Sequence, residues 1–139
     1  PHICLDPVLA AEMAKSIFNG IVSTDKENEA IYRENLKNLT KKLEELDNAF
    51  KELASGSERK DLVTSHAFFD YPARRYGLNQ VAITGLSPQE EPSLQKMREL
   101  VEFCQGNGIK YIFTVPGENS KLIDVLSRDT GAEVLEINP

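Results

Sequence analysis

From residue 60 onward, short runs of β-forming residues alternate with segments of helical periodicity, and this alternation constrains the fold more than any other feature. The spacing leaves room for one helix between successive strands, which is typical of parallel crossover connections. The expected strands are 62–65, 80–84, 111–115 and 133–137, and the expected helices are 67–76, a segment capped by Ser93, and a segment capped by Asn119 or Ser120. The sequence therefore predicts an α/β fold: a four-stranded parallel sheet with flanking helices, preceded by a long linker α-helix.

The long helix is expected over residues 25–54. Apolar residues recur there at alternating spacings of four and three, and lysine and glutamate fill the gaps. Thr24 and Glu27 match the capping-box pattern at its start. At 1.5 Å per residue such a helix is about 45 Å long. Two interpretations stay open: a coiled coil, or a long amphipathic helix that lies on its own domain.

A shorter helix is expected near the beginning of the chain. Asp6 is a suitable N-cap, and Pro7 suits the first helical position because a missing N–H costs nothing there. Apolar residues then recur every four positions up to Ile21. The chain thus divides into a short helical segment (1–24), a long helix (25–56) and an α/β part (57–139).

The composition argues against several classes of protein. With 22 acidic and 16 basic residues, the formal net charge is −6, which argues against a general nucleic-acid-binding protein. No apolar run approaches the roughly 20 residues of a membrane span. Two cysteines and two histidines are too few for a self-contained zinc module or a disulfide scaffold. The sequence leaves open whether Cys4 and Cys104 are paired.

His66 is the residue best placed for chemistry. It follows an expected strand and opens an expected helix, and ligands of open α/β sheets bind at the carboxyl ends of the strands. A neutral imidazole is a good zinc ligand, and the alternative is a polar histidine that is bonded to the backbone. Other polar pairs have simpler interpretations. Glu90-Glu91 are acids placed before a helix N-terminus, and Arg74-Arg75 are a solvated helix face.

Three stretches and the long helix resemble the motifs of one family. Residues 1–7 (PHICLDP) are similar to a PHxWLDP motif, and residues 64–78 (TSHAFFDYPARRYGL) are similar to SHxAFxYFAxRYGL. Residues 85–93 (GLSPQEEPS) are similar to GxSPxxEPS, and the Lys/Glu-rich helix is similar to the family's linker. The family is that of the metal-binding solute-binding proteins of bacterial zinc and manganese ABC transporters. The resemblance extends in order over essentially the whole chain.

The resemblance implies a metal site to which this chain contributes two ligands, His2 and His66. Histidine at the second position is typical of zinc-binding members and a carboxylate of manganese-binding ones, so the resemblance implies Zn²⁺ rather than Mn²⁺. Two further ligands would lie before Pro1 and just past Pro139. In that case 1–24 is the end of a first lobe, 25–56 is the linker helix, and 57–139 is a second lobe truncated before its last ligand.

The implied function is the capture of a divalent metal ion and its delivery to the membrane permease of an ABC transporter for import. This would happen outside the cytoplasm, in the periplasm or on the outer face of the bacterial cell membrane. Neither an enzymatic reaction nor a nucleic-acid partner is expected. Because the chain offers at most two ligands, we expect it to bind zinc weakly. We also expect self-association through the exposed apolar face of helix 25–54.

Three positions depart from the family pattern. Cys4 stands where the family has tryptophan. Pro72 falls inside the expected helix 67–76 and should kink it. Val115 stands where family members often have an acidic residue, and Glu118 follows three positions later.

Two hypotheses from other classes do not need the resemblance. One is a cytosolic α/β interaction module that dimerises through the heptad helix and binds no metal. The other is an α/β enzyme that uses His66 as a general base, although the sequence near His66 offers no nucleophile with an orienting partner.

Overall fold

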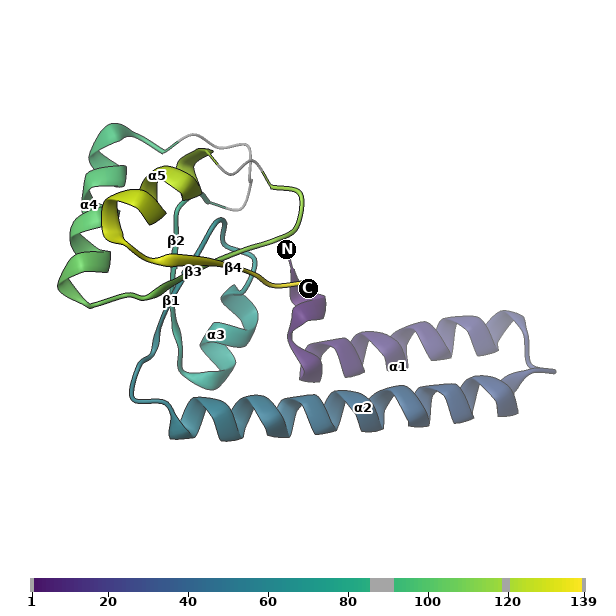
Figure 1. Cartoon of the computed structure of the whole chain (residues 1–139). Helices are drawn as coiled ribbons and strands as arrows, with labels where there is room; N and C mark the ends of the chain where they lie inside the picture. The colour runs from purple at the N-terminus through teal and green to yellow at the C-terminus, as the bar shows by residue number, and fades with distance from the viewer. Residues whose placement is uncertain (1, 86–91, 119–120, 139) are drawn as a thin grey trace.

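The computed structural model describes residues 2–85, 92–118 and 121–138. Its α/β part contains a sheet of four parallel strands in the order β2-β1-β3-β4 (Figure 1). The strands are β1 (Asp61–Thr64), β2 (Asn79–Ala82), β3 (Tyr111–Thr114) and β4 (Glu133–Glu136). The predicted α/β fold with a four-stranded parallel sheet is confirmed, and each strand ends slightly earlier than the sequence indicated.

Three helices connect the strands: α3 (Asp70–Tyr76), α4 (Leu94–Gly106) and α5 (Lys121–Thr130). Helices α4 and α5 lie together on one face of the sheet, and α3 lies on the other (Figure 1). The chain leaves β1 towards β2 but leaves β3 towards β4, in the opposite direction, so the connections diverge between β1 and β3. In open α/β sheets such a switch point opens a crevice at the carboxyl ends of the strands.

The main hydrophobic core lies between the sheet and the pair α4 and α5. Ser93 caps α4 as predicted, because its side chain accepts a hydrogen bond from the N–H of Lys96. Burial of one of the larger aliphatic side chains in this core stabilises the fold by about 1.5–3 kcal/mol. The buried members of the core are Val63, Ile83, Leu100, Cys104, Ile112, Ile123, Leu126 and Ala132. The predicted cap at Asn119 or Ser120 lies outside the described residues, as does the pair Glu90-Glu91.

The helix predicted over 67–76 is shorter than expected, since α3 begins only at Asp70. Pro72 therefore falls in the first turn of α3, where its missing N–H would have no partner within the helix. The predicted kink at Pro72 is wrong for this reason. The helix ends at Gly77, whose φ of 68° is the left-handed conformation that glycine adopts without steric cost.

Two long helices precede the α/β part. Helix α1 (Pro7–Thr24) and helix α2 (Glu29–Gly56) run side by side, and the far end of α2 passes beneath α3 (Figure 1). Both predictions for the start of α1 are confirmed. Asp6 is the N-cap and accepts hydrogen bonds from the N–H groups of Val8 and Leu9, and Pro7 is the first helical residue. Of the two interpretations of the long helix, the structure supports the one in which it lies on its own chain.

The predicted capping box at the start of the long helix is wrong. Thr24 is the last residue of α1, and its hydroxyl donates back to the carbonyl of Ile21. The turn between the helices is instead organised by Asp25, whose carboxylate accepts hydrogen bonds from the Tyr32 hydroxyl (2.6 Å) and the Asn28 amide (2.9 Å). Thr24 cannot cap α2 because it still belongs to α1, and α2 begins only at Glu29.

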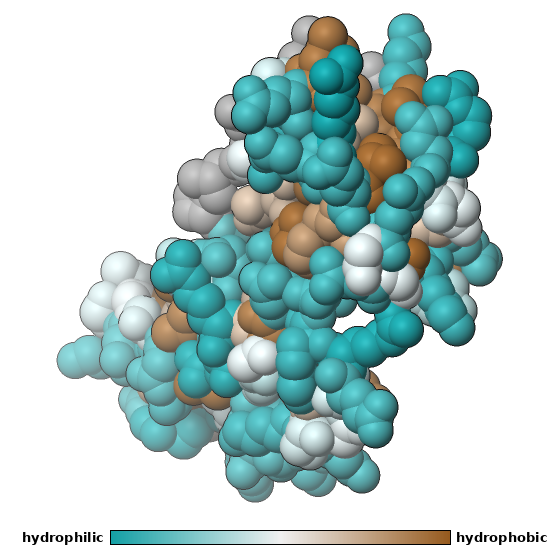
Figure 2. Space-filling view, turned by 90° about the vertical axis from the view of Figure 1, so that its left-hand side faces the viewer, coloured by the Kyte–Doolittle hydropathy of each residue, from teal (hydrophilic) through white to brown (hydrophobic). Residues whose placement is uncertain are grey.

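The surface is polar over most of the side that faces the viewer in Figure 2, and hydrophobic residues gather there only in small groups. Within the described residues, no helix combines the length and the apolar character needed to cross a membrane. Cys4 and Cys104 are both free, the first exposed and the second buried in the core.

Candidate metal-binding site

His66 lies just beyond the carboxyl end of β1, at the switch point of the sheet. Its side chain is buried, with 6% of its surface exposed. The main chain around it is held firmly: the hydroxyl of Thr64 (2.9 Å) and the amide of Gln80 (3.2 Å) both donate to the carbonyl oxygen of His66. The N–H of Ser65 donates to the carbonyl of Phe113 on β3. These bonds fix the main chain from which the imidazole extends.

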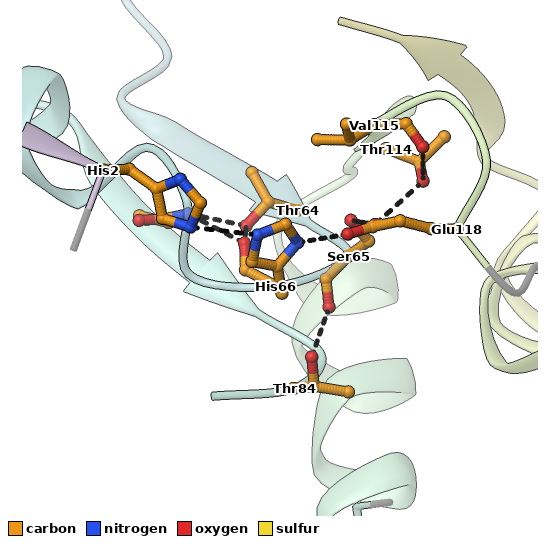
Figure 3. A network of polar contacts seen from close by, with 9 residues as sticks. His2, Thr64, Ser65, His66, Thr84, Thr114, Val115 and Glu118 are labelled. Atoms are coloured by element: carbon orange, nitrogen blue, oxygen red, sulfur yellow. Dashed lines mark hydrogen bonds and ion pairs between the residues drawn. The ribbon is translucent and has the colours of Figure 1, made fainter. Parts of the chain in front are cut away.

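His2 meets His66 although 64 positions separate them in the sequence. The two Nε2 atoms lie 3.4 Å apart and the ring centroids 5.2 Å apart (Figure 3). Burial lowers the pKa of His2 below its ordinary value, and the neighbouring His66 lowers it further. His2 is therefore mostly neutral at pH 7, with a ring nitrogen lone pair available to a ligand.

Glu118 completes the polar network on the other side of the His66 ring (Figure 3). Its Oε1 lies 2.5 Å from Nδ1 of His66, a close contact that departs from the direction of an ideal hydrogen bond. Its Oε2 accepts a hydrogen bond from the hydroxyl of Ser65 and lies 3.3 Å from the hydroxyl of Thr114. Glu118 follows β3 and His66 follows β1, and these strands are neighbours in the sheet.

In the sequence, Glu118 stands out only as an acid three positions after Val115, the place where the family often has one. Its contact with His66 depends on the pairing of β1 with β3, which are not consecutive strands. The available signal was its place shortly after an expected strand, because all parallel strands end at the same edge of the sheet.

Asp6 and Arg75 form a second contact that the sequence did not reveal. The Arg75 guanidinium donates to the buried carboxylate of Asp6 at 2.6 Å, and this contact raises the pKa of Arg75. The interpretation of Arg74-Arg75 as a solvated face holds for Arg74, which is exposed and pairs with Asp70 on its own helix. Arg75 is also exposed in part, but that interpretation missed its contact with Asp6. The contact ties the start of α1, and with it the short 3₁₀ turn after His2, to α3.

A third contact ties α2 to the same helix. The hydroxyl of Tyr76 donates to Asp47 at 3.0 Å, and Lys51 donates to the other carboxylate oxygen at 2.6 Å. The hydrogen bond from Lys51, and then that from Tyr76, lowers the pKa of Asp47. Arg75 and Tyr76, two successive residues of α3, thus bind the buried carboxylates of two different helices.

The distance between the two histidines suits a shared metal ion. With Zn–N bonds of about 2.0–2.1 Å, two ligand nitrogens at adjacent corners of a tetrahedron lie about 3.3–3.4 Å apart. The observed Nε2–Nε2 distance is 3.4 Å. Among the described residues, no group of three or more His, Cys, Asp and Glu side chains is arranged to hold a metal. The chain therefore presents two convergent imidazoles rather than a full coordination shell.

Two curated relatives of this chain have names that describe zinc uptake or zinc binding. A curated relative, the high-affinity zinc uptake system protein ZnuA of Bacillus subtilis, is 37% identical over 99% of this chain and 43% of its own length. The zinc-binding lipoprotein AdcA of Streptococcus pneumoniae is 36% identical over all of this chain and 28% of its own length. The chain thus spans less than half the length of these curated relatives.

Solved structures agree with the sequence relatives. A Zn(II)-bound variant of AdcAII from Streptococcus pneumoniae matches with a TM-score of 0.90 and 37% identity, over all of this chain and 50% of the other. The laminin-binding protein Lmb of Streptococcus agalactiae, described as an adhesin with metal-transporting activity, matches with a TM-score of 0.93 and 33% identity, over 54% of its chain. The profile of the family described as zinc-uptake complex component A, periplasmic, matches residues 1–139. This chain is a member of that family.

Proposed function

We propose that this chain provides part of the metal site of a solute-binding protein, with His2 and His66 as ligands. That protein captures a divalent metal ion outside the cytoplasm and delivers it to the permease of an ABC transporter. The observation that carries the proposal is the 3.4 Å separation of the two Nε2 atoms, one from the start of the chain and one from the switch point of the sheet. The metal acts as cargo, and its transport needs no bond to be made or broken in the protein.

Zn²⁺ is the favoured ion. Imidazole nitrogens suit zinc, whereas Mn²⁺ prefers carboxylate and other oxygen ligands. The names of the relatives agree, because they describe zinc uptake and zinc binding. Two imidazoles fill only half of a tetrahedral shell, so we expect this chain alone to bind zinc weakly. The ligands that complete the shell would belong to parts of a longer protein.

Substitution of either histidine tests the ligand assignment. Zinc binding by this chain, measured by competition with a chromophoric chelator, should fall at least tenfold in His66→Ala and in His2→Ala. Cys4→Ser is the matched control, because Cys4 is exposed, lies two residues from His2, and offers a thiol that could bind zinc on its own. Zinc affinity that is unchanged in His66→Ala, or that depends on Cys4 instead, contradicts the proposal.

We also propose that α2 makes this chain self-associate. Leu39, Leu46 and Leu53 lie seven residues apart on α2 and have 46%, 45% and 71% of their surface exposed. Residues at this spacing lie on one helix face, so together they form an apolar stripe along α2. The metal-free cytosolic module that dimerises through this helix is not favoured as the function, because the family match covers the whole chain.

A further inference from the structure

We infer that Glu118 is a positioning residue, which holds His66 in the tautomer that directs a bare Nε2 towards the metal. The inference rests on the proposed function, because it concerns how one of the two ligands is prepared for zinc. Glu118 itself is not placed among the ligands, since its contact is with Nδ1 of His66, on the side of the ring opposite His2 (Figure 3).

The carboxylate is a strong constraint on the imidazole proton. A neutral imidazole carries one N–H, and an ionised carboxylate can only accept hydrogen bonds. With Oε1 of Glu118 only 2.5 Å from Nδ1, the proton belongs on Nδ1, and Nε2 keeps its lone pair. The side chains of His66 and Glu118 are 6% and 11% exposed, so water competes little for this contact. His66 is thereby ready to bind a metal through Nε2 without moving a proton.

Glu118 is in turn oriented by two hydroxyls. Its Oε2 accepts from Ser65 and lies 3.3 Å from Thr114, which leaves Oε1 directed at His66. Ser65 and Thr114 come from the ends of β1 and β3, so the carboxylate is anchored to two neighbouring strands. A carboxylate behind a metal-binding histidine fixes the ring and raises its basicity, and loss of such a partner typically costs 10–100-fold in metal affinity.

The same assignment gives a direction to the contact between the two histidines. If His66 Nε2 carries no proton, it must be the acceptor across the 3.4 Å to His2, and His2 must be the donor through its own Nε2–H. Binding of zinc through Nε2 of His2 then requires a change of tautomer at His2, in which the neutral ring loses its proton from Nε2 to solvent and gains one from solvent on Nδ1. His66 is the pre-arranged ligand and His2 is the one that adjusts.

The test measures the tautomer and the affinity separately. Long-range ¹H–¹⁵N NMR spectra of the metal-free chain should show His66 protonated on Nδ1 in the wild type and shifted towards Nε2–H in Glu118→Ala. Zn²⁺ affinity should fall 10–100-fold in the same variant. Glu118→Gln, which keeps an acceptor oxygen but not the charge, should retain the Nδ1–H tautomer and lose less affinity. Glu136→Ala is the matched control, because Glu136 is an exposed acid at the carboxyl end of β4.

Two outcomes would overturn the inference. One is a His66 that stays protonated on Nδ1 in Glu118→Ala. The other is a zinc affinity in Glu118→Ala no lower than that of Glu136→Ala. If Glu118→Ala fails to fold, Ser65→Ala serves in its place for the tautomer, with a smaller shift towards Nε2–H expected. Ser65→Ala and Glu118→Gln then serve for the zinc affinity, with smaller losses expected than in Glu118→Ala. These outcomes differ from those that contradict the proposed function. The proposed function fails if zinc binding is unchanged in His66→Ala, whereas the inference about Glu118 can fail while His66 is still a ligand.

Discussion

At the scale of single residues, buried charge is the most informative feature of this chain. Asp6 and Asp47 are buried carboxylates, and each has a charged or hydroxyl partner on α3. A buried carboxylate is stable only when it is paired or hydrogen-bonded, so these contacts determine where the helices can lie. Glu118 follows the same rule and is directed at His66 rather than at solvent.

Asp47 should make the stability of the chain depend on pH. Its pKa in the folded state is lowered, so the unfolded chain takes up this proton at a higher pH than the folded chain does. The stabilisation is therefore present above the pKa of the unfolded carboxyl, about pH 4, and is lost as the pH falls through the lower folded value. Urea unfolding at several pH values should show a steeper loss of stability below pH 4 in the wild type than in Asp47→Asn. Parallel curves for the two proteins would exclude Asp47 as a source of acid sensitivity.

At the scale of secondary structure, α3 is the element that joins the long helices to the sheet. It has only seven residues, yet it provides Arg75 to the start of α1 and Tyr76 to the middle of α2. The stacking of Phe50 of α2 on the Tyr76 ring, with centroids 5.0 Å apart, adds an apolar contact at the same place. The position of His2 relative to His66 depends on these contacts, since His2 directly precedes the segment that Asp6 anchors.

Removal of the Arg75 side chain should therefore weaken both the fold and the site. In Arg75→Ala the carboxylate of Asp6 stays buried and keeps only its two backbone hydrogen bonds. The Arg75 side chain is 31% exposed, so the expected loss is about 1–2 kcal/mol of unfolding free energy, less than for a fully buried pair. Zinc affinity should fall as well, because His2 loses its anchor. Arg74→Ala, on the same turn but solvent-exposed, is the control and should change neither quantity in urea unfolding and chelator competition.

At the scale of the whole molecule, the α/β part and the helical pair α1 and α2 meet at one end (Figure 1). His2, which precedes α1, contacts His66 of the α/β part. The remaining length of the two helices extends away from the sheet and carries apolar side chains that this chain does not cover. Their groove is lined by apolar residues of both helices, among them Ile17, Phe18 and Leu36. Apolar surface of this kind favours association with another surface.

The exposed stripe on α2 should produce concentration-dependent association. Analytical ultracentrifugation of the chain should show dimers or larger species whose fraction rises with concentration. The double variant Leu46→Glu and Leu53→Glu should shift the profile to monomer, because it places two negative charges in the apolar stripe. Lys41→Glu is the control, since Lys41 is an exposed polar position of the same helix. A monomeric wild type at high concentration would contradict the proposal.

Much of this molecule follows from local sequence patterns. The period of apolar residues, the N-caps Asp6 and Ser93, and the end of the expected helix at residue 76 follow from nearby interactions alone, and the structure confirms them. The alternation of strands and helices determines the parallel sheet, because crossover connections of this length have few other solutions. His66 could be singled out as a candidate because residues after parallel strands line the ligand-binding edge.

The tertiary structure alone decided which distant residues meet. The order β2-β1-β3-β4 places Glu118 beside His66. The contact of α3 with Asp6 and the 3₁₀ turn before α1 places Nε2 of His2 3.4 Å from Nε2 of His66. These contacts join positions 52 and 64 residues apart in the chain, and no local propensity encodes them. They arise when buried carboxylates and strand edges find partners in the folded chain, which is a property of the whole arrangement rather than of any segment.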